Sequence, residues 1–275
     1  MARPQIEFVQ CQALPWQDRP LADLRPGTQA RILSEDGETG ACSLLVRYPP
    51  GWSRETDGFL NADEEFLVLD GDLTVGQHDY GYLGYGHLPA GLPRRRVASR
   101  TGAVVLTFFS AEPKLKQGTV ECDRSRLVEG IDAFAVPYTG NFHPEFPPGA
   151  GRKMLFEDPD TGDQSWLLGT LGLRWAERAE RHPVVEEMFL IAGEVHGNLG
   201  VMRPGAYFWR PPNIAHGPYG SLTGNIYFFR TKGGKLATEY EDPERPFAWW
   251  PDHRPVLPDE LAGFAEEMPR AARPW

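Results

Sequence analysis

The chain has 275 residues, a formal net charge of −10 at pH 7 and an isoelectric point near 5.2. An acidic chain repels phosphate, so we expect no nucleic-acid partner. The longest apolar runs are far shorter than the roughly 20 residues of a membrane-spanning helix, which argues against a membrane partner. The N-terminus lacks the pattern of a secretion signal, and the three cysteines show no paired spacing, so we expect a cytoplasmic protein.

Short strands dominate the predicted secondary structure. The segments 66–75 (FLVLDGDLTV) and 188–195 (MFLIAGEV) are apolar runs broken by glycine, and 103–109 (AVVLTFF) is a further short apolar run. The chain also carries 30 glycines and 26 prolines, a density that suits many tight turns. Helical periodicity occurs only in the tail, at PDELAGFAEEM. These features predict an all-β protein built as a sandwich or small barrel.

The chain repeats itself at a constant offset of 122 positions, which is the spacing of Glu35 and Glu157. The dipeptides Glu64-Glu65 and Glu186-Glu187 keep this offset, as do many other pairs, among them Tyr85 with Tyr207, Pro89 with Pro211, and Thr101-Gly102 with Thr223-Gly224. A repeat this long indicates two domains rather than a solenoid. We predict an N-terminal domain at 1–135, a C-terminal domain at 136–245 and a tail at 246–275.

Four positions carry ionisable groups in the second copy, and the first copy differs from it at three of them. The second copy has Glu180, His182, Glu186 and His216, where the first has Gly58, Leu60, Glu64 and Arg94. Side chains alternate along a strand, so Glu180 and His182 should point to the same face, and Glu186 falls at the same parity. His216 comes from a later strand. Converging in a barrel, these groups would form a metal site with nitrogen and oxygen ligands.

The residue patterns around Glu180 to Glu186 and around His216 resemble the two sequence motifs of the cupin superfamily. Its first motif is His-x-His, three or four residues, Glu, six residues and Gly; ERHPVVEEMFLIAG matches it with Glu180 at the first histidine position. Its second motif is Gly, five residues, Pro-x-Gly, two residues and His; GAYFWRPPNIAH matches it with Asn213 at the second glycine. Because both copies resemble cupins, the chain looks like a bicupin. It is most similar to a bacterial two-cupin family close to the cupin domains of anti-sigma factors.

The resemblance implies two tandem double-stranded β-helix (jelly-roll) barrels and one divalent metal. The ligands would be Glu180, His182, Glu186 and His216 of the second barrel. Fe(II) is favoured, with Mn, Zn, Ni and Cu as alternatives. Glu180 is either a ligand or, if it stays unbound, a catalytic base. The first barrel is expected to keep the scaffold without metal, and its Arg94 would bind an anion or pair with Glu64.

Other side chains receive weaker assignments. Four residues found only in the second copy are candidates for substrate binding: Trp209, Arg210, Tyr219 and Tyr227. Glu65 and Glu187 are expected to face outward. Five histidines in turn-like or proline-rich contexts are expected at the surface: His78, His87, His143, His196 and His253.

Three functions remain open at this point. The first is a metal-dependent, dioxygenase-like oxidoreductase that uses O2 on a small organic substrate such as a diketone, phenol or thiol. The second is a non-redox lyase, isomerase or hydrolase in which the ion acts as a Lewis acid. The third is a small-ligand sensor or binding protein. A homodimer is plausible because the edge strands of such barrels need cover.

Overall fold

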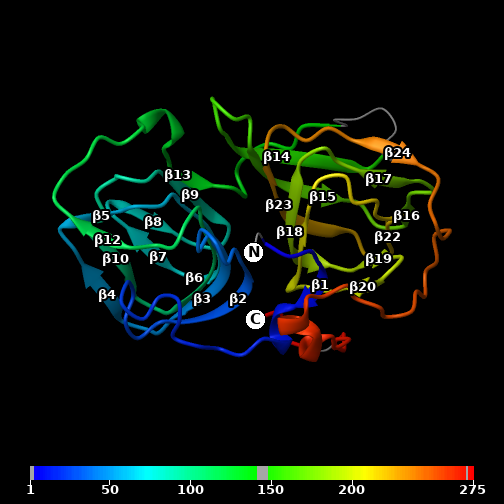
Figure 1. Cartoon of the computed structure of the whole chain (residues 1–275), viewed down its shortest axis with the longest axis horizontal. Coiled ribbons are helices and arrows are strands. Elements are labelled where there is room, and N and C mark those ends of the chain that lie inside the picture. The colour runs from blue at the N-terminus through cyan, green and yellow to red at the C-terminus, as the bar shows by residue number, and fades with distance from the viewer. Residues whose placement is uncertain (1–2, 141–147, 271) are drawn as a thin grey trace. The chain divides into compact units, whose positions relative to one another are not determined.

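The structure is a computed structural model that describes residues 3–140, 148–270 and 272–275. The chain forms two compact units. The first consists mainly of Leu14–Val136, and the second of Pro4–Ala13 together with Pro137–Trp275. Both consist almost entirely of strands and turns (Figure 1). In the described part of the chain, no helix has the length and apolarity needed to cross a membrane.

In the part of the first unit that the structure describes, the strands form three sheets. Their strand orders are β13-β9-β6-β11-β3-β2, β4-β10-β7-β8 and β12-β5. The elements are β2 (Gln29–Glu35), β3 (Cys42–Tyr48), β4 (Trp52–Glu55), β5 (Gly58–Leu60), β6 (Glu64–Gly71), β7 (Leu73–Val75), β8 (His78–Tyr80), β9 (Gly84–Leu88), β10 (Arg96–Ser99), β11 (Ala103–Phe109), β12 (Leu115–Gln117), the 3-10 helix η2 (Arg124–Arg126) and β13 (Val128–Asp132).

The described residues of the second unit form three sheets with corresponding orders, β1-β21-β18-β23-β15-β14, β16-β22-β19-β20 and β17-β24. The elements are β1 (Ile6–Gln10), the 3-10 helix η1 (Cys11–Ala13), β14 (Ala150–Glu157), β15 (Gln164–Thr170), β16 (Arg174–Trp175), β17 (Ala179–Arg181), β18 (Val185–Gly193), β19 (Val195–Gly197), β20 (Gly200–Met202), β21 (Ala206–Arg210), β22 (Gly220–Ser221), β23 (Asn225–Lys232), β24 (Glu239–Glu241) and the 3-10 helix η3 (Asp259–Phe264) in the tail.

The sequence repeat is also a structural repeat, as one turn shows in detail. In the first unit, Asp36 Oδ1 accepts hydrogen bonds from the backbone N–H groups of Glu38 and Thr39, at 2.9 and 3.0 Å. In the second, Asp158 Oδ1 accepts the equivalent pair, at the same two distances. An aspartate that binds the backbone two and three residues ahead stabilises a turn locally, so the same turn forms in both copies.

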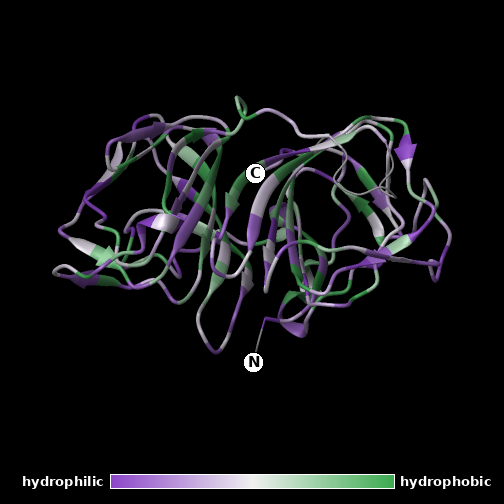
Figure 2. Cartoon of the chain, turned by 90° about the horizontal axis from the view of Figure 1, so that it is seen from above, coloured by the Kyte–Doolittle hydropathy of each residue, from purple (hydrophilic) through white to green (hydrophobic). Residues whose placement is uncertain are grey.

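Each unit has its own hydrophobic core, formed by side chains on the inner faces of the strands. Apolar residues lie along the strands of both units in Figure 2. On β18 the alternate residues Met188 and Leu190 are buried in the second core, where Phe208 and Phe229 join them. Glu186 is the next residue at this parity, so the strand that builds the core also turns a carboxylate inward.

The N-terminal residues depart from the predicted domain boundaries. Strand β1 belongs to the second unit, where it pairs antiparallel with β21, and Ile6 lies opposite Trp209. On its other side, the backbone of Glu7 forms a bridge with Val256 of the tail. Residues 4–13 and the tail therefore complete the second unit, whereas the sequence had assigned residues 1–135 to the first domain. Pairing across such a separation leaves no local pattern to detect.

Candidate metal centre

The backbone brings the two motif segments of the second unit together. Glu180 N–H donates to His216 C=O, and His216 N–H donates to Glu180 C=O, both at 2.9 Å. Asn213 N–H donates to His182 C=O at 2.7 Å. Asn213 has φ of +64°, a left-handed conformation that asparagine tolerates better than most residues. This explains how Asn213 can occupy the glycine position of the motif.

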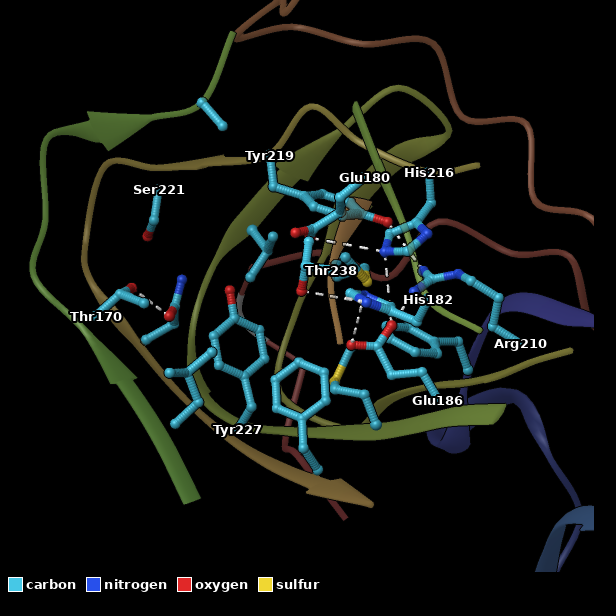
Figure 3. Close-up of a pocket in the computed structure, with 18 of the residues that line it drawn as sticks. Thr170, Glu180, His182, Glu186, Arg210, His216, Tyr219, Ser221, Tyr227 and Thr238 are labelled. Atoms are coloured by element: carbon cyan, nitrogen blue, oxygen red, sulfur yellow. Dashed lines mark hydrogen bonds and ion pairs between the residues drawn. The ribbon is translucent and has the colours of Figure 1, made fainter. Parts of the chain in front are cut away.

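The four predicted ligands lie together on one side of a cavity: Glu180, His182, Glu186 and His216. Thr170 and Ser221 line the same cavity further away (Figure 3). His216 Nε2 lies 3.6 Å from an oxygen of Glu180 and 3.6 Å from an oxygen of Glu186. His182 Nε2 lies 3.5 Å from the other oxygen of Glu186. Possible ligand atoms of Glu180, His182 and His216 all lie within 4.8 Å of one another, so one cation could contact all three.

Both imidazole rings are held in the tautomer that a metal requires. His182 Nδ1 lies 2.9 Å from the carbonyl of Ala237, and His216 Nδ1 lies 2.9 Å from the carbonyl of Ile214. A carbonyl oxygen can only accept, so each Nδ1 carries a proton, and in the neutral ring each Nε2 then carries the lone pair. Thr238 Oγ1 is further from His182 Nδ1, at 3.4 Å. Both Nε2 atoms are buried without a hydrogen-bond partner, and the donor set therefore fits a divalent ion.

Glu180 is ionised in this environment. Burial raises the pKa of its carboxyl, but the hydrogen bond and charge that His216 supplies when its Nε2 is protonated, with the charges of a protonated His182 and of Arg210, outweigh burial and lower the pKa to about 2.

Arg210 links Glu186 to a residue that the motifs do not include. Its Nη1 forms an ion pair with Glu186, and its Nε and Nη2 bind the two oxygens of Glu7 at 2.7 and 2.5 Å. Its Nη2 also lies 3.0 Å from the hydroxyl of Tyr219. Burial lowers the pKa of Arg210, but Glu7, Tyr219 and Glu186 raise it by more, so it is charged. The sequence predicts Arg210 as a substrate-binding residue. Arg210 does line the cavity, but the nitrogens named above already bind other side chains of the protein.

The cavity has a volume of about 950 Å³, including the open solvent at its mouth. Its walls are mostly apolar with a few polar groups, which is the kind of lining that binds small organic molecules. Tyr219 and Tyr227 line it, as predicted, and burial raises the pKa of both phenols. Trp209 is not among the lining residues. Phe208 and Arg210 face the cavity, so the residue between them on β21 points the other way, and its prediction as a substrate ligand ignored strand parity.

Several lining residues escaped the sequence analysis. Arg174 and Arg178 enter from the β16–β17 region, and Thr238 and Tyr240 from the segment around β24. Burial lowers the pKa of Arg174. None of these residues lies in a motif. Only the absence of Arg174 and Arg178 from the corresponding positions of the first copy, which hold Trp52 and Thr56, could have drawn attention to them.

Two predictions of surface position are wrong. His87 and His196 are buried, and their Nδ1 atoms lie 2.7 and 2.6 Å from the backbone carbonyls of Arg126 and Trp249. His78 and His253 are partly buried, and His143 lies outside the described residues.

Glu65 and Glu187 are not on the cavity side, but they are buried rather than exposed. They accept hydrogen bonds from the repeated tyrosines Tyr85 and Tyr207, at 2.7 and 2.6 Å. The repeat of these acids thus reflects a shared Glu–Tyr pair in each unit.

In the first unit, guanidinium groups surround the glutamate that corresponds to Glu186. Glu64 forms an ion pair with Arg25, and its other oxygen lies 3.5 Å from Arg94 Nε. Arg94 also donates to the carbonyls of Leu92 and Leu88, at 3.1 and 3.0 Å. Arg94 therefore pairs with Glu64, one of the two roles predicted for it.

Comparisons with known proteins place the fold. A family model described as a domain of unknown function, DUF4437, matches residues 9–238. No curated protein matches the chain. A solved structure of a provisionally assigned dioxygenase from Nostoc punctiforme is similar, with 19% identity, 88% of this chain and 92% of that chain covered, and a TM-score of 0.79.

Oxalate decarboxylase from Bacillus subtilis is also similar in structure. It has 13% identity, covers 85% of this chain and 78% of its own, and gives a TM-score of 0.55. Another structure of that enzyme, which describes its Mn(II) centres, has 15% identity, covers the same shares and gives a TM-score of 0.54. At these identities the likeness shows the fold alone, and the predicted all-β cupin fold is confirmed. The closeness to cupin domains of anti-sigma factors stays a prediction.

Proposed function

The chain belongs to the DUF4437 family, a domain of unknown function, so we propose a function from its own geometry: the second unit is a metal-dependent enzyme acting on a small organic molecule. The observation that carries this proposal is the pair of buried Nε2 atoms of His182 and His216, each fixed as a lone-pair donor by a carbonyl behind it. Such an arrangement has little structural value without a cation, because a buried nitrogen without a partner is destabilising.

The ligands would be His182, His216, Glu180 and Glu186. Two imidazoles and two carboxylates would suit Fe(II) and Mn(II). Zn, Ni and Cu remain alternatives, since affinity alone favours the later metals. A bound ion would supply Lewis acidity and, as Fe(II) or Mn(II), redox chemistry. The apolar wall formed by Met188, Phe208 and Phe229 would limit water at the site, and Tyr219 and Tyr227 would offer phenol groups to a substrate.

Among metal-dependent reactions, we favour oxygenation of a diketone, phenol or thiol. The likeness to the provisionally assigned dioxygenase extends over most of both chains, which supports this choice as a fold-level analogy. A non-redox lyase, isomerase or hydrolase is the second candidate, and the likeness to oxalate decarboxylase supports it in the same way.

The first test is metal content. Protein purified without added metal is compared with a His182→Ala/His216→Ala variant, and His87→Ala serves as control because His87 is also a buried histidine bound to a carbonyl through Nδ1. We expect about one ion per chain in the wild type and in the control, and loss of the ion in the double variant. Equal metal in the wild type and the double variant would end the proposal.

The second test separates the candidate reactions. The Fe(II)-loaded protein is given a panel of diketones, phenols and thiols while oxygen consumption is recorded. Oxygen uptake coupled to product supports the oxygenase. Turnover that is unchanged without O2, or with Zn(II) in place of Fe(II), would point to the non-redox enzyme. Tight binding without turnover would point to a sensor.

A further inference from the structure

Glu7 is a buried carboxylate with no counterpart in either motif. It lies on β1, is 4% exposed, and is 203 positions away from its main partner Arg210. Its backbone is fixed on both sides of the strand. Its N–H donates to the carbonyl of Val256 at 2.7 Å and its C=O accepts from Val256 N–H at 2.5 Å, while β21 lies along the other edge. Glu7 is therefore held rigidly where it meets Arg210.

The Glu7–Arg210 contact has the geometry of a strong ion pair. Two parallel bonds join the carboxylate to the guanidinium, and both side chains are almost fully buried. The remaining nitrogen of the guanidinium, Nη1, donates to one oxygen of Glu186. The guanidinium thus lies between two carboxylates, only one of which belongs to the candidate metal centre.

The charges show what Glu7 contributes. Arg210 alone beside Glu186 would neutralise a ligand that a cation needs, and an unpaired guanidinium would repel that cation. With Glu7 included, the linked groups Glu7, Arg210 and Glu186 together with the partly buried Glu180 sum to −2, which balances one divalent ion; Arg174 and Arg178 also line the cavity. The first unit shows the opposite arrangement, in which two arginines, Arg25 and Arg94, face the single carboxylate of Glu64.

We propose that Glu7 is a positioning residue of the metal centre and acts through Arg210. It offsets the charge of the guanidinium and holds it against one oxygen of Glu186. The other oxygen of Glu186 then stays directed at His182 Nε2, 3.5 Å away. This inference rests on the proposed metal-dependent function and assigns a part of the centre to the N-terminal strand.

The test measures Mn(II) affinity of the full chain by calorimetry and the bound ion by electron paramagnetic resonance. Glu7→Gln should weaken Mn(II) binding about 10- to 100-fold, as changes behind a metal ligand typically do, and should alter the fine structure of the spectrum. Glu7→Asp keeps the charge and should recover part of the affinity. Glu187→Gln is the matched control, since Glu187 is a buried carboxylate paired with Arg230 in the same unit but away from the cavity, and it should bind Mn(II) like the wild type.

A double variant isolates the role of charge. In Glu7→Gln/Arg210→Met the uncompensated guanidinium is gone, so affinity should rise above that of Glu7→Gln alone. Melting of the metal-free proteins identifies variants that fail to fold. Wild-type affinity and spectrum in Glu7→Gln would overturn this inference while leaving the metal centre intact, and so would an equal loss in Glu187→Gln. A wild type that binds neither Mn(II) nor Fe(II) would instead overturn the proposed function.

Discussion

Glu180 and His216 exchange two backbone hydrogen bonds of 2.9 Å, although they are far apart in the chain. The two side chains that this pairing brings together are the carboxylate and the imidazole of the candidate centre, 3.6 Å apart. The site is thus fixed by main-chain pairing before any metal arrives. A preorganised set of ligands loses little conformational freedom on binding an ion, and so binds it more tightly.

Replacing Glu180 distinguishes a ligand from a base. Glu180→Gln retains the shape of the side chain but loses its charge. If Glu180 is a ligand, the variant should bind metal at least about tenfold more weakly, because one anionic donor has gone. If Glu180 is a base, the variant should keep its metal and lose only turnover. Metal titration alongside steady-state rates decides between the two.

The left-handed backbone at Asn213 predicts an unusual order of stability among its variants. Asn213→Gly should be tolerated, because glycine adopts a φ of +64° freely. Asn213→Val should cost about 1–2 kcal/mol or more, because a β-branched side chain is strained there. Thermal melting measures the cost. Equal stability of the two variants would contradict the role given to this turn.

A matched pair of glycines tests the duplication. A Cβ on Gly193 would lie 1.9 Å from the carbonyl oxygen of Gly224, and one on Gly71 would lie 1.8 Å from that of Gly102. Both glycines also have positive φ. Gly71→Ala and Gly193→Ala should therefore each destabilise the protein by more than about 1 kcal/mol. Gly51→Ala is a control, since it also has positive φ but meets no atom within 4 Å, so its cost should be smaller. Chemical denaturation provides the three values.

His87 makes part of the stability depend on pH. Burial lowers the pKa of its imidazole below 6.5, so the unfolded chain takes up a proton at a pH where the folded chain does not. The contribution is fully present above pH 6.5 and is lost as pH falls from there through the lowered folded pKa. Urea midpoints measured between pH 7.5 and 5 should fall less steeply for His87→Gln than for the wild type. Parallel curves would show that His87 does not titrate in this way.

Sequence alone could predict the fold and much of the candidate site, because both depend on local patterns. The constant offset of the repeat aligns the two copies residue by residue. The alternation of side chains along a strand correctly predicts that Glu180, His182 and Glu186 face one cavity. Parity was not applied to Trp209, which is why that residue was misassigned. The burial of His87 and His196 depends on carbonyls of segments that lie 39 and 53 positions away. Glu7 could not be found at all, since nothing near it in the sequence indicates an arginine partner.

The position of β1 has a consequence for how the protein is made. On the ribosome Glu7 emerges long before its partner, and at 5–20 residues per second the intervening 203 positions take roughly 10–40 s to synthesise. During that time the first unit can fold, while the N-terminal strand waits without its neighbours. The second unit can be completed only when both ends of its chain are present. A bulky protein fused to the N-terminus should therefore slow the folding of the second unit, because strand β1 of that unit lies next to the point of fusion in the sequence.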